Sequence, residues 1–250
     1  VFDTRKKIEE ISSKMATVSE IEYENPYLAT EDSQNCTIVF NNDKIENQVC
    51  GYFTDKAIEK IKLTKIIKGE NVLEITYPVA RHTSLENCFV LGDFAVKLNG
   101  IEKTVTDLPA KIAFGDISQM LMPFYGGNII YKLPFEEKQS NIKIKVKDYK
   151  GALIKVYAEN KEERIVFAPY ECSFEKVKSG IIKVKLFGNR ANSFGALHII
   201  NPIAPWGCKW IGPDAWDFMK DGTENWTYEY LLKPFGLQES PVIEIKNSRV

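Results

Sequence analysis

The chain has 250 residues, and its 33 Lys and Arg residues nearly balance its 34 Asp and Glu residues. A chain of this length can bury the core of one large domain or of two small ones. Without a basic excess it is not expected to bind nucleic acid, because non-specific affinity for a polyanion comes from Lys and Arg that neutralise phosphates. No apolar run approaches the roughly 20 residues of a membrane-spanning helix, so a membrane is not an expected partner either.

Five cysteines are scattered through the chain, with no C-x-x-C spacing. An odd number without paired spacing argues against a disulfide framework and a structural zinc site, so the thiols are expected to pack as small hydrophobic groups. A reducing bacterial cytoplasm is the expected location, with secretion as the alternative. The N-terminus has neither an initiator Met nor the pattern of a signal peptide, which suggests a processed chain or part of a longer one.

The first element expected is a short N-terminal helix over residues 3–15, with Asp3 as its N-cap and with Ile8, Ile11 and Met15 at helical spacing. Strand patterns dominate the rest of the chain, and a single helical turn is expected at 116–122. Apolar and β-branched runs predict strands at 36–40, 72–77, 88–98, 128–135, 141–147, 152–158, 163–167, 182–186, 226–232 and 241–246. The glycine inside 88–98 predicts a bulge or a corner between sheets.

Two of these segments alternate strictly between apolar residues and lysines. Residues 141–147 read NIKIKVK, and 182–186 read IKVKL. This pattern predicts half-buried antiparallel strands with lysines on the solvent side, which we interpret as solubilising and edge-protecting. Many short strands with turn residues every ~8–12 positions predict an all-β sandwich fold.

A weak internal repeat divides the chain. The order strand, polar turn, aromatic strand start, Lys-Gly turn and strand is found at 37–75 and, with Lys-Ser-Gly as its turn, at 154–184. Each copy predicts one sandwich, so two β-sandwich domains are expected in tandem, at 1–99 and 100–250, with the boundary at the Asn99-Gly100 turn. The first copy looks short of its N-terminal strands.

The order of these motifs resembles the galactose-binding-domain-like jelly roll, a module that accompanies large bacterial glycoside hydrolases of family two and the α-L-rhamnosidase-like enzymes. The similar segments span nearly the whole chain in order. They are LENCFVLGDF at 85–94, PFYGGNIIY at 123–131, GNRANSFGALH at 188–198, WIGP at 210–213 and LKPFGL at 232–237.

The resemblance implies a non-catalytic accessory or carbohydrate-binding region of a glycoside-hydrolase-like protein, whose upstream catalytic domain would be a partner in the same polypeptide. Two alternatives stay open: a purely structural buttress of that missing barrel, and a free-standing glycoside hydrolase that uses loop carboxylates between Asp214 and Glu229. No spacing singles out a carboxylate pair, so no catalytic residue is assigned. No cofactor is expected, and a structural calcium ion stays open without a located site.

The best candidate for ligand contact is the segment 188–237, which holds all four tryptophans of the chain. An aromatic ring stacks on the face of a pyranose, and neighbouring amide and guanidinium groups can donate hydrogen bonds to its hydroxyls, so weak carbohydrate binding is expected here. The alternative is that these rings pack in the core and that the polar residues tie a loop down. His198, between two apolar residues, is interpreted as packed. The candidate carbohydrate-contacting residues are Trp206, Trp210, Trp216, Asn189, Arg190, Asn192 and His198.

Overall fold

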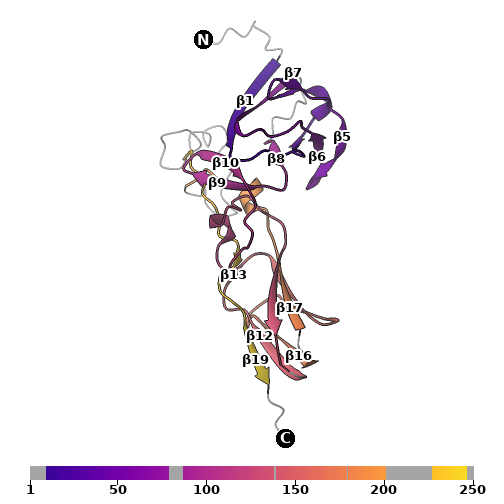
Figure 1. Cartoon of the computed structure of the whole chain (residues 1–250), viewed down its shortest axis with the longest axis vertical. Helices are drawn as coiled ribbons and strands as arrows, with labels where there is room; N and C mark the ends of the chain where they lie inside the picture. Colours follow the sequence, from indigo (N-terminus) through magenta and orange to yellow (C-terminus); the bar gives the residue numbers. More distant parts are fainter. Residues whose placement is uncertain (1–9, 79–86, 138, 179, 201–226, 247–250) are drawn as a thin grey trace, which may run out of the picture. The chain divides into compact units, whose positions relative to one another are not determined.

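The computed structural model describes residues 10–78, 87–137, 139–178, 180–200 and 227–246 (Figure 1). Its contacts divide the chain into two compact units, residues 1–108 and 109–250. Within the described residues nearly all regular structure is strand, and helix is confined to one α-helical turn, α1 (Ala191–Phe194), and two 3-10 turns, η1 (Ser33–Asn35) and η2 (Ile117–Gln119). The expected all-β sandwich fold is confirmed.

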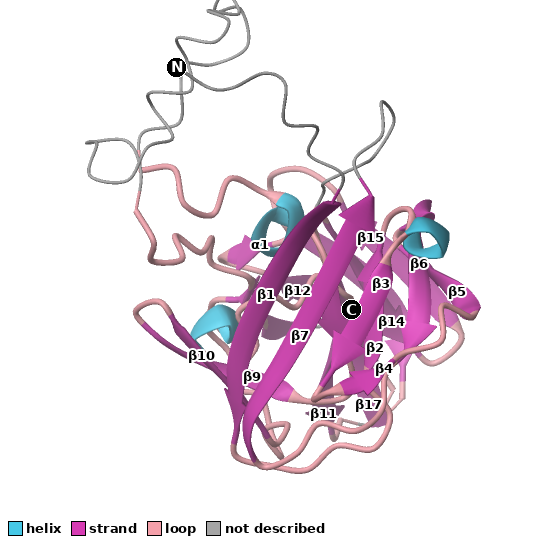
Figure 2. Cartoon of the chain, turned by 90° about the horizontal axis from the view of Figure 1, so that it is seen from above, coloured by secondary structure: helices cyan, strands magenta, loops and turns pink. Residues whose placement is uncertain are grey.

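The first unit consists of a six-stranded sheet, in the order β4-β3-β7-β1-β10-β9, and a four-stranded sheet, in the order β5-β6-β2-β8 (Figure 2). Residues from both sheets, such as Ile38 and Ile75 on one side and Leu28 and Ile61 on the other, form one core. The strands are β1 (Glu10–Ser19), β2 (Tyr27–Thr30), β3 (Thr37–Phe40), β4 (Asp43–Lys44), β5 (Val49–Phe53), β6 (Asp55–Lys62), β7 (Gly69–Pro78), β8 (Phe89–Leu91), β9 (Ala95–Asn99) and β10 (Glu102–Thr106).

The helix expected over residues 3–15 is wrong where the structure describes it. Residues 10–15 belong to β1, which pairs antiparallel with β7 along its whole length and parallel with β10 at its end. Met15 packs against the core of the unit from this strand. A few apolar residues at helical spacing are a weak local signal, and the long ladder with β7 overrides it. Residues 3–9 lie outside the described residues.

The run at 88–98 turns a corner, as its central glycine predicts. It breaks into β8, which belongs to the four-stranded sheet, and β9, which belongs to the six-stranded sheet. A side chain on Gly92 would collide with the rings of Phe94 and Tyr23. The Asn99-Gly100 pair, where the domain boundary was expected, forms the turn between β9 and β10, and the division between the two units falls after Leu108.

The second unit contains a four-stranded sheet, β11-β17-β14-β15, opposite a three-stranded sheet, β16-β12-β19, with a short pair, β13-β18. Its core includes Ile142 and Ile144 from one sheet and Val156 and Val184 from the other, all fully buried. The strands are β11 (Ile129–Phe135), β12 (Ser140–Lys145), β13 (Tyr149–Lys150), β14 (Leu153–Ala158), β15 (Lys161–Ile165), β16 (Glu171–Val177), β17 (Gly180–Phe187), β18 (Gly236–Leu237) and β19 (Val242–Lys246).

Two expected elements of this unit have different outcomes. The helical turn expected at 116–122 is present as η2, and the side chain of Asp116 caps it by accepting a hydrogen bond from the Ser118 N–H at 2.9 Å. The strand expected at 226–232 is wrong for residues 227–232, which are irregular. Their backbone pairs locally with the segment after α1 instead, since Leu231 N donates to Leu197 O at 2.7 Å.

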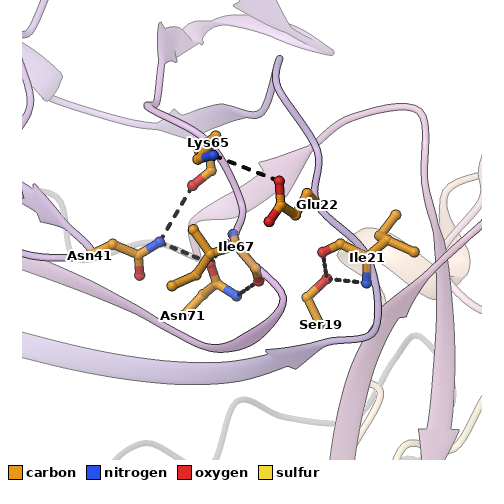
Figure 3. A network of polar contacts seen from close by, with 7 residues as sticks. All are labelled: Ser19, Ile21, Glu22, Asn41, Lys65, Ile67 and Asn71. Carbon is orange, nitrogen blue, oxygen red and sulfur yellow. Dashed lines mark hydrogen bonds and ion pairs between the residues drawn. The ribbon is translucent and has the colours of Figure 1, made fainter.

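A buried asparagine holds together the turns at one edge of the first unit (Figure 3). Asn71, with 1% of its surface exposed, accepts hydrogen bonds from Asn41 Nδ2 at 2.8 Å and from Ile67 N at 2.9 Å. Its Nδ2 donates to the carbonyls of Ile67 at 2.8 Å and Gly69 at 3.1 Å. The Asn71 amide thus accepts two hydrogen bonds and donates two, so burial leaves none of its donors or acceptors without a partner.

We expect Asn71→Ala to lower the free energy of unfolding of the first unit by about 1–3 kcal/mol, because it leaves buried donors and acceptors without partners. Urea denaturation followed by circular dichroism measures the change. The matched control is Asn35→Ala at an exposed position in η1, which should change stability by less than about 0.5 kcal/mol. Equal stability of the two variants would contradict the role assigned to Asn71.

Candidate functional site

The candidate residues that the structure describes lie where β17 ends and the chain enters α1. The backbone at this point passes very close to the loop before β11: a Cβ on Gly188 would collide with the carbonyl oxygen of Gly127, and one on Gly126 would lie 2.9 Å from that of Asn189. Only glycine at these positions permits such an approach. The glycines of the two motifs 123–131 and 188–198 therefore bring these segments together.

Asn189 and Arg190 are exposed at this junction. The Oδ1 atom of Asn189 accepts a hydrogen bond from the Ala191 N–H at 3.0 Å, which fixes the carboxamide at the start of α1. The Arg190 side chain runs beside Gly126. Both residues thus present polar groups to solvent from a backbone that is fixed in place, as the sequence interpretation requires for contact with a sugar.

Asn192 has a different role from the one expected. It is 6% exposed, and its amide makes a reciprocal pair of hydrogen bonds with the backbone of Lys233, each of 2.8 Å. Because both of its heteroatoms are committed to the chain, Asn192 ties α1 to residues 227–237 rather than facing a ligand. This is the loop-tying alternative that the sequence left open, and we remove Asn192 from the ligand-contacting set.

His198 is packed, in agreement with its interpretation from the sequence. Its Nδ1 atom lies 3.1 Å from the carbonyl oxygen of Thr227 and 3.2 Å from that of Glu229, so the tautomer with a proton on Nδ1 donates here. The ring lies 4.8 Å from that of Tyr230, which in turn meets Phe124 edge-on at 5.1 Å. His198 is therefore held against residues 227–230 by these hydrogen bonds and by the ring contact.

Three aromatic side chains on the segments that meet at this junction are exposed, and sequence reasoning did not single them out as ligand contacts. Tyr125 is 38% exposed, Phe194 is 43% exposed and Tyr228 is 59% exposed. The expected aromatic residues, Trp206, Trp210 and Trp216, lie outside the described residues. We define the α1 surface as Tyr125, Asn189, Arg190, Phe194 and Tyr228.

The described residues offer little for metal or thiol chemistry. No group of three or more His, Cys, Asp or Glu side chains in the described ranges could hold a metal ion. Burial raises the pKa of the Cys36 thiol to about 11, and burial together with the charges of Glu163 and Glu171 raises that of Cys172 to about 12. Since the thiolate is the nucleophile, these two cysteines are unreactive near neutral pH.

No protein-family model matches the chain, and a search of curated proteins finds no match. No helix within the described ranges is both long and apolar enough to span a membrane. The arguments for function therefore depend on the geometry of the described surfaces.

We expect iodoacetamide at about pH 8 to modify Cys50, whose side chain is exposed, and to leave Cys36 and Cys172 unmodified. The elevated pKa values of the two buried thiols keep them protonated at this pH, and burial excludes the reagent. Peptide-resolved mass spectrometry measures each rate, with the urea-unfolded chain as the control. If Cys36 or Cys172 in the folded chain reacted as fast as in that control, the packing of these residues would be wrong.

Proposed function

We propose that the chain is a non-catalytic binding region of a glycoside-hydrolase-like protein and that the α1 surface holds a carbohydrate weakly. The observation that supports this function most is that three exposed aromatic residues lie on segments that are hydrogen-bonded to the one carrying the exposed residues Asn189 and Arg190, or on that segment itself. In this proposal each of the two units is a jelly roll of the galactose-binding type, in line with the motif order in the sequence.

The chemistry of the α1 surface suits a sugar. A pyranose presents C–H groups on its faces, which stack on an aromatic ring such as Tyr228 or Phe194, and hydroxyls at its edge. The guanidinium of Arg190 and the side-chain amide nitrogen of Asn189 are donors for those hydroxyls. The surface is open to solvent, so a dissociation constant on the order of 1 mM, about −4 kcal/mol, is expected.

The packing beneath the α1 surface supports a preformed site. Ser193 Oγ donates to the Phe124 carbonyl at 2.9 Å, and Asn192 binds the backbone of Lys233 on the other side. These bonds join three segments that are far apart in the sequence. Loops that a rigid sandwich holds in place lose little conformational entropy when a ligand binds.

The α1 surface gives no support to a hydrolase. Glycoside hydrolysis needs two carboxylates about 5–9 Å apart on either side of the scissile bond, and none of the five residues of this surface is acidic. The structural-buttress alternative predicts no ligand at all. Binding without turnover is therefore the outcome that distinguishes our proposal from both alternatives.

We expect a panel of neutral mono- and oligosaccharides to include at least one ligand, detected by calorimetry or by tryptophan fluorescence of the full chain. Tyr228→Ala and Arg190→Ala should each weaken this binding about tenfold, because each removes one of the few contacts. The matched control is Tyr52→Ala, since Tyr52 is also 59% exposed but lies on β5 of the first unit.

No response to any sugar would favour the structural buttress, and hydrolysis of an aryl-glycoside panel would favour the free-standing enzyme. If Tyr228→Ala and Arg190→Ala bound the sugar with unchanged affinity, the binding site would lie elsewhere than on the α1 surface. Trp206→Ala and Trp210→Ala test the expectation from the sequence separately.

A further inference from the structure

The outward face of the sheet β11-β17-β14-β15 carries a concentration of positive charge. Strand alternation directs the core residues of β17 inward and Lys183 and Lys185 outward, and the neighbouring strands add cations on the same side. We define the lysine face as this outward surface; its cations are Lys132, Lys155, Arg164, Lys183 and Lys185.

The register of the sheet places these cations directly opposite one another. Lys132 on β11 is paired with Lys183 on β17, and Lys155 on β14 lies between Lys185 and Arg164 on its two neighbouring strands. Like charges in directly opposed positions destabilise a sheet. Glu162 relieves part of this repulsion, with Oε1 at 2.7 Å from Lys155 Nζ and 3.5 Å from Arg164 Nε.

The remaining three cations have no such relief. Among the described residues, no carboxylate lies within 4.0 Å of the ammonium group of Lys132, Lys183 or Lys185. The lysines of β12 and the residues after it, which have the same alternating sequence, differ in this respect. Lys145 pairs with Glu244 at 2.7 Å and Lys147 with Glu239 at 3.6 Å. The sequence interpretation of both rows as solubilising is therefore incomplete for the lysine face.

The lysine face is also hollowed. A groove of about 370 Å³ lies on it, lined by Ile130, Tyr157, Glu159, Ile181, Lys183 and Lys185. The Lys185 ammonium lies 4.7 Å from the centre of the Phe187 ring, which holds the charge close to the sheet. The groove thus combines Lys183 and Lys185 with apolar walls formed by Ile130 and Ile181, and the acidic residue in its lining, Glu159, accepts a hydrogen bond from the Lys178 N–H at 2.7 Å.

We propose that the lysine face binds an anionic polysaccharide. Its carboxylates or sulfates would pair with Lys132, Lys183 and Lys185, and the C–H faces of its sugar rings would lie against the exposed side chains of Ile130 and Ile181. Charge complementarity carries the proposal, because an anionic chain relieves the repulsion between opposed lysines that the protein leaves uncompensated. The inference is independent of the α1 surface.

Other polyanions fit this face less well. Nucleic-acid bases stack on exposed aromatic rings, and on the described strands of this face Tyr157 and Phe187 are both partly buried. A membrane-binding face inserts several aromatic and large apolar side chains into the interface, whereas the exposed large apolar residues on the described strands of this sheet are two isoleucines, Ile130 at 51% and Ile181 at 56%.

The test is calorimetric titration of the full chain with polygalacturonate and with dextran sulfate, and with neutral dextran as the uncharged polymer. We expect the two anionic polymers to bind and dextran not to bind. Lys132→Gln combined with Lys183→Gln should weaken the binding about tenfold, since each exposed charge pair contributes a factor of a few. Binding should also weaken between about 20 mM and about 150 mM NaCl.

The matched control is Lys145→Gln combined with Lys147→Gln, which removes the same charge from the other sheet and should retain the affinity. Tyr228→Ala should retain it as well, which separates this proposal from that of the α1 surface. Thermal midpoints verify that each variant is folded. Absence of binding, equal loss in the two double variants, loss in Tyr228→Ala, or tighter binding to duplex DNA or to phosphatidylserine vesicles would overturn the proposal.

Discussion

The alternation of side chains along each β-strand determines what this protein can bury and what it must expose. In β17, Ile182, Val184 and Leu186 fill the core, so the residues between them must face solvent. Alternation alone does not decide what those outward residues do. Strand register decides it, because register selects the neighbour that each lysine meets. On β12 one neighbour of each lysine is a glutamate, and on β17 one neighbour of each lysine is another lysine.

Much of the fold could be predicted from the sequence, because the relevant signals are local. Strict alternation at 141–147 identifies β12, and the glycine within 88–98 marks a change of sheet. The strand β1 could not be predicted where a helix was expected at 3–15, because β1 is stabilised by its pairing with β7, some 60 residues later in the chain. The ion pair of Lys145 with Glu244 likewise joins residues 99 positions apart, and no local pattern reveals it.

The candidate site was predicted in part, for a similar reason. Residue type pointed to Asn189 and Arg190, which are exposed, and equally to Asn192, which is buried and committed to the backbone of Lys233. Asn189 and Arg190 precede α1 and are exposed, whereas Asn192 lies within α1 and is buried. Tyr228 and Phe194 gave no signal, since an aromatic residue in sequence looks the same whether it packs or faces solvent.

The positive charge of the lysine face acts only at short range. The net charge of the chain is −1, so acidic residues elsewhere in the sequence balance the cations of this face. Salt at physiological concentration screens the charges of the face beyond about 8 Å. The face therefore exerts no pull on distant molecules and acts only within a few ångströms of its surface. The face would slow the dissociation of a bound polymer without increasing the rate of its association.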